Sequence, residues 1–169
     1  GGHITIAGAN SPASLASRPI RVLLCDEVDR YPISAGTEGD PLSLAAKRTQ
    51  NFWNRRIVWV STPTIMGISR IEKAFEVSTQ EHWCIPCPTC GEYQPYEWGR
   101  IVYKDLPEPL MVCSSCGASH TETEWKAGQE RGIWIARREG DRHTRGFHLN
   151  AFASPWATWG NLIDQYQED

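Results

Sequence analysis

The most informative stretch of the sequence is Val22-Leu23-Leu24-Cys25-Asp26-Glu27, an apolar run that ends in two acidic residues. A nearly continuous run of apolar side chains is typical of a parallel strand that is buried on both faces. A second such run, Ile57-Val58-Trp59-Val60, ends in Ser61-Thr62-Pro63. If the two strands are parallel neighbours, Thr62 comes to lie beside the acid pair, at the carboxyl edge where such sheets bind ligands.

The segments around these strands predict an α/β fold. Asp40 and Pro41 supply an N-cap and a proline at the first helical position, which predicts a helix from residue 40 to about 51. We expect a further helix over 69–77 and a short strand over 4–7. Strands that alternate with helices indicate a mostly parallel sheet covered by helices.

The sequence changes in character from about residue 80 to 125, where Cys, Pro, Gly and Trp are frequent and short strands and turns are expected. After this region, the pattern predicts a short helix over 124–131 and strands over 134–136 and 146–150. Thr158 is placed to cap a last helix.

The composition excludes several classes of protein. The chain has 169 residues, of which 40% are hydrophobic and 22% charged, and its formal net charge is only −3. These values exclude a disordered tail and a strongly basic nucleic-acid arm. No apolar run is long enough to span a membrane, and the first residues do not form a signal region. The start at Gly1, in what reads as a strand, and the last residues in what reads as a helix predict a fragment of a longer protein.

Two copies of C-x-x-C-G predict a zinc site. They are Cys87-Pro88-Thr89-Cys90-Gly91 and Cys113-Ser114-Ser115-Cys116-Gly117, with 22 residues between the pairs. Each pair can reach one tetrahedral Zn²⁺ from a tight turn, and the Gly permits the left-handed backbone that such a turn needs. Four thiolates fill the coordination sphere, so we expect a structural zinc rather than a catalytic one. The predicted ligands are Cys87, Cys90, Cys113 and Cys116.

Cys84 allows another register, because Cys84-x-x-Cys87 is also a C-x-x-C pair. A glycine follows Cys90 but not Cys87, which favours the first register and leaves Cys84 as a spare thiol. The ligand type would also suit an iron–sulfur cluster, which we rank below zinc.

The acid pair has the form of a Walker B motif. In P-loop NTPases, an Asp at the strand end lies near Mg²⁺, and the next acid can polarise a water for attack on the γ-phosphate. In helicases and packaging motors, a Ser/Thr motif such as Ser61-Thr62-Pro63 senses the γ-phosphate. The sequence contains no G-x-x-x-x-G-K-[ST] motif to bind the phosphates. Either a P-loop precedes Gly1 or the ATPase interpretation is wrong.

Taken in order along the chain, several segments resemble the ATPase domain of the lambda-type phage terminase large subunit. They are Gly8-Ala9-Asn10-Ser11-Pro12, Ser17-Arg18-Pro19-Ile20-Arg21, Asp26-Glu27-Val28-Asp29-Arg30, Ser61-Thr62-Pro63, the first Cys pair, and Gly146-Phe147-His148-Leu149-Asn150 leading to Ser154-Pro155-Trp156. The order and spacing fit along nearly the whole chain.

The resemblance implies a motor that hydrolyses ATP to move double-stranded DNA into a procapsid, with a separate nuclease domain beyond Asp169. By the resemblance, Asp26 binds Mg-ATP, Glu27 is the catalytic glutamate, and Ser61 and Thr62 form the coupling motif. The implied partners are double-stranded DNA, a small terminase subunit, the portal protein and further copies of the chain, in the host cytoplasm and without a membrane.

The sequence therefore predicts an α/β fold, namely the Walker B half of a P-loop NTPase parallel sheet with an inserted four-cysteine zinc ribbon. The expected parts are ATPase core at 1–79, zinc ribbon at 80–125, and a return to the core with the start of a linker at 126–169. Without a Walker A motif, this piece should be inactive alone. Two alternatives stay open: a non-enzymatic zinc-ribbon module that binds nucleic acid or protein, and a helicase-like ATPase with a zinc insertion.

Overall fold

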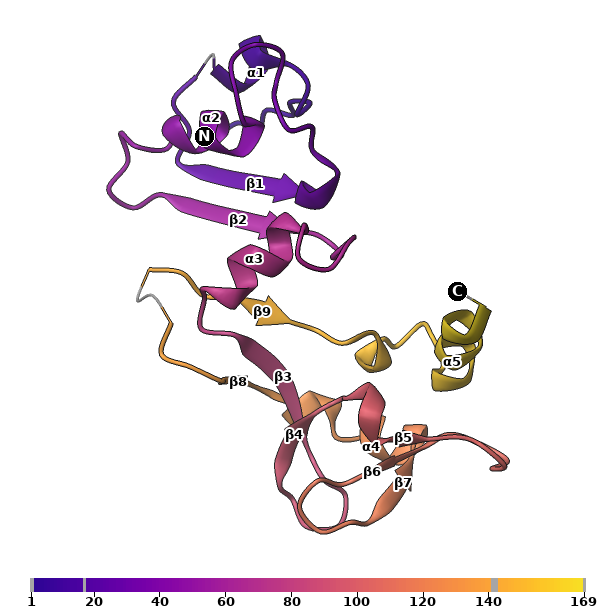
Figure 1. The fold of residues 1–169 in the computed structure, drawn as a ribbon. Helices are drawn as coiled ribbons and strands as arrows, with labels where there is room; N and C mark the ends of the chain where they lie inside the picture. Colours follow the sequence, from indigo (N-terminus) through magenta and orange to yellow (C-terminus); the bar gives the residue numbers. More distant parts are fainter. Residues whose placement is uncertain (1, 17, 141–142, 169) are drawn as a thin grey trace. The chain divides into compact units, whose positions relative to one another are not determined.

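The computed structural model in Figure 1 describes residues 2–16, 18–140 and 143–168. The chain is a mixed α/β protein with parallel and antiparallel sheets. It divides into two compact units, residues 1–74 and 75–169. Within the described residues, no helix is both long and apolar enough to cross a membrane.

The first unit contains a two-stranded parallel sheet. Strand β1 (Val22–Asp26) pairs with strand β2 (Arg56–Val60), so that Val22 lies opposite Arg56 and Asp26 opposite Val60. The two strands end at the same edge, as their arrows in Figure 1 show. This confirms that the two apolar runs form neighbouring parallel strands.

Short helices accompany this sheet. They are α1 (Pro12–Ala16), the 3₁₀ turn η1 (Val28–Arg30), α2 (Pro41–Lys47) and α3 (Arg70–Glu76). The N-cap prediction for α2 is confirmed, because the Asp40 carboxylate accepts a hydrogen bond from Ser43 N at 2.8 Å. A small core of Cys25, Val28 and Leu42 joins β1, η1 and α2.

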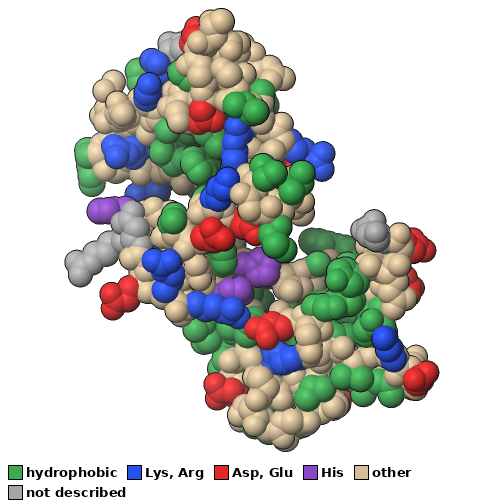
Figure 2. Space-filling model, viewed as in Figure 1, with side chains coloured by type: hydrophobic (Ala, Val, Ile, Leu, Met, Phe, Trp, Pro, Cys, Tyr) green, Lys and Arg blue, Asp and Glu red, His purple; other side chains and the backbone are tan. Residues whose placement is uncertain are grey.

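Two expectations for the first unit are wrong. Residues 4–7 form no strand, and the side chains of Ile4 and Ile6 are 95% exposed. The ladder of β1 goes to β2, so residues 4–7 lack the partner that a strand requires. The apolar strands are not buried on both faces either, since Leu24 is 72% and Val60 55% exposed, and Figure 2 shows hydrophobic side chains on the surface. A sheet of two strands cannot cover its own edges and both of its faces.

The second unit is built around strand β3 (Glu81–Pro86). β3 pairs antiparallel with β4 (Tyr93–Pro95) and β8 (Ile133–Ala136), and parallel with the short strand β9 (Phe147–His148). A separate antiparallel sheet follows the order β5-β6-β7. Its strands are β5 (Ile101–Val102), β6 (Leu110–Val112) and β7 (Ser119–Thr121).

The helices of the second unit are short, except the last. They are η2 (Trp98–Arg100), α4 (Glu122–Lys126), η3 (Gln129–Arg131), η4 (Ala151–Ala153) and α5 (Trp159–Glu168). The helix expected over 124–131 is divided, since α4 ends at its C-cap Ala127 and Gly128 precedes η3. Thr158 caps α5 as predicted, because its Oγ1 accepts a hydrogen bond from Asn161 N at 3.2 Å.

Large aromatic side chains fill the core of the second unit. Trp125 and Trp159 are fully buried, and Phe152 and Met111 pack in the same cluster. Each buried indole has a partner: Trp125 Nε1 donates to the Met111 carbonyl at 3.0 Å, and Trp159 Nε1 to the Phe152 carbonyl at 2.9 Å. Residues 152–163 thus share a core with residues 85–125. The expected boundaries at 79/80 and 125/126 stay predictions.

A histidine pair lies where β9 joins β3. His82 and His148 are opposite each other in the ladder, and their Nδ1 atoms are 3.3 Å apart. Burial, with the positive charge of Arg137 and the neighbouring His148, lowers the pKa of His82 to about 4. Burial and Arg137 also lower the pKa of His148. Both rings therefore favour the neutral form in the folded chain.

We expect this pair to make the second unit less stable in mild acid. The ordinary histidine pKa is about 6.5. Between pH 6.5 and 4, His82 is therefore protonated in the unfolded chain but neutral in the folded chain. The contribution of His82 to the free energy of unfolding is fully present above about pH 6.5 and is lost as the pH falls towards 4. Between pH 7 and 5, the Tm of His82→Gln should fall less with decreasing pH than the Tm of the parent chain. His3→Gln, in the first unit, should keep the parent slope. An equal slope for His82→Gln and the parent would contradict this assignment.

Candidate functional site

The acid pair lies at the carboxyl end of β1. Asp26 is the last residue of the strand, and Glu27 follows in the left-handed conformation, with φ 54° and ψ 47°. This conformation is uncommon for a residue other than glycine. Both residues are exposed, and the Glu27 carboxylate forms an ion pair with Arg30, with 3.0 Å between Oε2 and Nε. The turn therefore presents two carboxylates to solvent at the strand end.

Ser61 and Thr62 follow β2 at the same edge of the sheet. Ser61 Oγ accepts a hydrogen bond from the backbone N–H of Asp29 at 3.2 Å and donates to the Thr62 carbonyl at 3.2 Å. The loops after β1 and β2 are thus joined directly, and the joining side chain is Ser61 rather than Thr62. This geometry gathers two carboxylates and two hydroxyls at one strand edge.

Asp29 is a residue of this edge that sequence reasoning missed. Its carboxylate accepts hydrogen bonds from Thr64 N at 3.0 Å, Thr64 Oγ1 at 3.2 Å and Ile71 N at 2.9 Å. Partial desolvation raises the pKa of Asp29, but hydrogen bonds from Ser69, Ile71 and Thr64 outweigh it and lower the pKa to about 2. Its partners Thr64 and Ile71 lie 35 and 42 residues away, so no local pattern identifies it.

Arg70, at the start of α3, stabilises the backbone of residues 28–32, which follows the acid pair. Its Nη1 donates to the carbonyls of Val28 at 3.3 Å and Tyr31 at 3.1 Å, and its Nη2 to the carbonyl of Pro32 at 2.9 Å. Its guanidinium also lies 3.6 Å from Asp40. With Asp29, Arg70 fixes the backbone that follows the acid pair.

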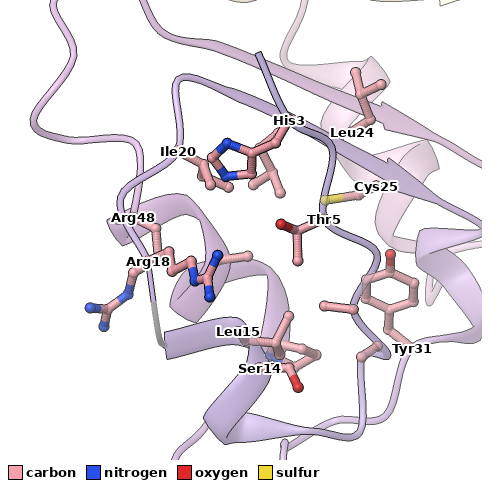
Figure 3. Close-up of a pocket in the computed structure, with 15 residues that line it drawn as sticks. His3, Thr5, Ser14, Leu15, Arg18, Ile20, Leu24, Cys25, Tyr31 and Arg48 are labelled. Atoms are coloured by element: carbon pink, nitrogen blue, oxygen red, sulfur yellow. The ribbon is translucent and has the colours of Figure 1, made fainter. Parts of the chain in front are cut away.

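A pocket of about 120 Å³ lies elsewhere in the first unit, between the N-terminal segment, β1 and α2. Figure 3 shows His3, Thr5 and Arg48 among the side chains around it. Neither the acid pair nor Ser61 and Thr62 line it, although Cys25, next to Asp26 in the chain, does.

The second unit brings four thiols together as the Cys cluster, which consists of Cys87, Cys90, Cys113 and Cys116. All four Sγ atoms lie within 4.8 Å of one another. Cys87 Sγ is 3.9 Å from Cys116 Sγ, and Cys90 Sγ is 3.7 Å from Cys113 Sγ. A Zn–S bond of about 2.3 Å in tetrahedral geometry places sulfurs about 3.8 Å apart, whereas a disulfide requires about 2.05 Å. The donor set and its spacing therefore fit a zinc ion.

Two β-hairpins present these thiols. The first pair lies in the turn between β3 and β4, and the second in the turn between β6 and β7. Gly91 and Gly117 have φ of 75° and 72°, and their N–H groups donate to the carbonyls of Cys87 and Cys113. The glycines thus close each turn with a backbone conformation that favours glycine.

The surroundings of the four thiols differ. Desolvation raises the pKa of Cys113, but hydrogen bonds from the N–H groups of Cys116 and Ser115 and from Gln94 outweigh it and lower the pKa to about 6. Cys84 lies outside the Cys cluster, on β3, where burial raises its pKa. The thiols that the structure gathers are those of the expected register, and Cys84 is not among them.

Comparison with known proteins now defines the class. Residues 1–134 match the family described as phage terminase large subunit gpA, ATPase domain, and the chain belongs to this family. Among curated proteins, it is similar to the terminase, large subunit, of Enterobacteria phage P21, with 25% identity over 183 aligned residues. The match covers 92% of this chain and 28% of that protein, so the chain spans less than a third of its relative's length. No solved structure matches the chain.

Loss of the Asp29 charge should loosen the strand edge. Asp29→Asn replaces a carboxylate that accepts three hydrogen bonds, and bonds to charged groups contribute about 1.5–3 kcal/mol each. Because this carboxylate is partly exposed, we expect a loss of about 1–2 kcal/mol in the free energy of unfolding in urea. Hydrogen exchange at the Thr64 and Ile71 amides should accelerate. Asp164→Asn, on the exposed side of α5, serves as the control. Unchanged exchange at both amides would remove Asp29 from this role.

Proposed function

We propose that the first unit carries the Walker B and coupling elements of an ATPase that packages viral DNA. The observation that carries this proposal is the parallel pairing of β1 and β2, which puts Asp26, Glu27 and Ser61 at one strand edge. Membership of the terminase ATPase family supports ATPase activity in general.

In this proposal, the two carboxylates have different tasks. Asp26, at the strand end, holds Mg²⁺ of bound Mg-ATP, and Glu27 orients and polarises the attacking water. The left-handed backbone at Glu27 supports the assignment, because residues in sparsely populated conformations cluster at functional sites. Ser61 and Thr62 couple the occupied site to movement, and the Ser61–Asp29 bond offers a direct link between the two loops.

In this proposal, the phosphate-binding loop is supplied by residues other than these 169. The sequence has no Walker A motif, and phosphates require backbone amides and a lysine for tight binding. The exposed apolar side chains of β1 and β2 support further strands and helices around this sheet in the whole protein, as a P-loop NTPase parallel sheet would supply.

For the second unit we propose a structural zinc ion held by the Cys cluster within a zinc ribbon over residues 80–125. Four thiolates leave no open position, so the ion stabilises the two hairpins and carries out no chemistry. Residues 1–79 and 126–169 then belong to the ATPase core and the start of a linker towards a nuclease domain. The Cys cluster is equally compatible with the second candidate, a non-enzymatic module that binds nucleic acid or protein.

The proposed setting follows from the family rather than from any contact in the structure. The whole protein would form a homo-oligomeric motor that moves double-stranded DNA through the portal protein into the procapsid, together with a small terminase subunit. A separate endonuclease domain would cut the DNA, and the work would take place in the host cytoplasm.

The catalytic role of Glu27 is tested in the full-length protein. Glu27→Gln should retain ATP binding and lower turnover at least about 100-fold, because general acid–base catalysis contributes 10²–10⁴. Binding is measured by equilibrium titration and turnover by phosphate release in the presence of DNA. Glu38→Gln, at an exposed loop carboxylate, is the matched control. Parent-like turnover in Glu27→Gln would exclude Glu27 as the catalytic glutamate, whereas absence of ATP turnover in the parent protein itself would favour the binding module.

The zinc proposal is tested by metal content. The chain should hold one zinc per molecule, and Cys87→Ser and Cys113→Ser should both lose it and unfold residues 80–125, because such sites contribute folding energy directly. Cys84→Ser should retain the metal, since this thiol lies outside the cluster. A stably folded second unit in a metal-free chain, checked by near-UV circular dichroism with and without chelator, would contradict the proposal.

A further inference from the structure

We infer that Gln94 and Arg100 are positioning residues for the metal in the Cys cluster. Together they stabilise the negative charge on the Cys113 sulfur. This inference rests on the zinc site proposed above and names the residues that stabilise its charge. Neither residue belongs to the C-x-x-C-G repeats.

The Gln94 amide contacts the cluster directly. The residue lies on β4 and is 3% exposed. Its Nε2 donates to Cys113 Sγ at 3.1 Å, a short distance for an N–H···S contact, and lies 3.3 Å from the Glu92 carbonyl. Gln94 thus reaches from the first hairpin to a thiol of the second.

The other end of the amide fixes its orientation. Gln94 Oε1 accepts from Ser114 N at 2.9 Å, from Ser114 Oγ at 3.2 Å and from the Arg100 guanidinium. All these neighbours can act as donors, and both neighbours of Nε2 are acceptors. The amide can therefore lie in only one of its two orientations, with N–H towards the sulfur.

Arg100 places a permanent positive charge behind this amide. Its side chain is 14% exposed, it donates to Gln94 Oε1 and to the Pro95 carbonyl, and it forms an ion pair with Glu97 at 3.3 Å. A cation on the amide oxygen polarises the amide and strengthens its N–H as a donor, because hydrogen bonds in a chain reinforce one another. Arg100, Gln94 and Cys113 form such a chain.

The metal centre needs this compensation. Four thiolates around Zn²⁺ carry a net charge of −2, and Cys87 and Cys113 are both 3% exposed. Buried negative charge is costly unless hydrogen-bond donors and cations face it. Cys113 also accepts from the N–H groups of Ser115 and Cys116 at 3.4 Å, so it is the thiol best supplied with donors among the described residues. We therefore expect the Cys113 thiolate to be the one whose negative charge the surrounding protein stabilises most.

The experiment compares metal binding in variants of the 169-residue chain. Gln94→Met keeps the length of the side chain and removes the donor, and Gln94→Glu replaces the donor with a second acceptor. Affinity for Zn²⁺ is measured by competition with a chromophoric chelator. We expect Gln94→Met to bind about 10- to 100-fold more weakly and Gln94→Glu at least as weakly, because loss of a group that supports a ligand has such an effect. Arg100→Met should also bind more weakly, and the double variant Gln94→Met/Arg100→Met should lose less than the product of the single losses.

A spectroscopic measurement separates this role from simple packing. In the Co²⁺-loaded chain, the thiolate-to-cobalt charge-transfer band should shift in Gln94→Met and Arg100→Met, since loss of the donor changes the electron density on sulfur. Gln165→Met and Arg131→Met, at exposed positions, should leave both affinity and band unchanged. If wild-type chain binds no zinc, the zinc proposal itself fails. If wild type binds zinc and the variants match it in affinity and in band position, this inference alone is overturned. If affinity falls and the band does not move, the residues only pack, and the inference is likewise overturned.

Discussion

Parallel pairing of β1 with β2 is the constraint on which the first unit depends. The register brings Asp26 opposite Val60, so whatever follows either strand emerges at the same edge. Asp29 and Arg70 then tie the two loops and α3 into one backbone framework. The Asp29 carboxylate reaches Thr64, beyond β2, because both strands end at this edge.

The second unit depends on a different kind of constraint. Its β3–β4 and β6–β7 hairpins are short, and each alone would be marginal in water. They converge at the Cys cluster, and Trp125 and Trp159 fill the space beside it. The bulk of these two indoles supplies apolar burial that hairpins of this size cannot generate by themselves.

The sequence was sufficient to predict features that depend on a few neighbouring residues. The apolar runs of β1 and β2, the Asp40 cap, the Thr158 cap and the two C-x-x-C-G turns are all legible within a few residues, and the structure contains each of them. The roles of the acid pair, Ser61 and Thr62 stay predictions, since geometry alone does not reveal turnover.

Contacts between residues that are far apart in the chain could not be predicted from the sequence. Asp29, Arg70 and Gln94 act on partners between 19 and 42 residues away, and nothing in their immediate neighbourhood distinguishes them from ordinary surface residues. The burial of the apolar strands was predicted wrongly for a related reason. The pattern of apolar residues indicates which side chains can be buried. Burial also requires helices or strands that cover these side chains, and the pattern of β1 and β2 does not show whether such elements are present.

The exposed edge of β2 has a practical consequence for the behaviour of the chain in solution. Among the residues that the structure describes, β2 pairs only with β1, so Ile57, Val58 and Trp59 form a β-prone segment with unpaired backbone groups along one side, which is a template for pairing with other chains. Arg55 and Arg56 precede this segment and Pro63 follows it shortly after, so charge and a proline act as gatekeepers against aggregation. Colloidal stability of the isolated chain would therefore depend on ionic strength, because salt screens the repulsion between these arginines on neighbouring molecules.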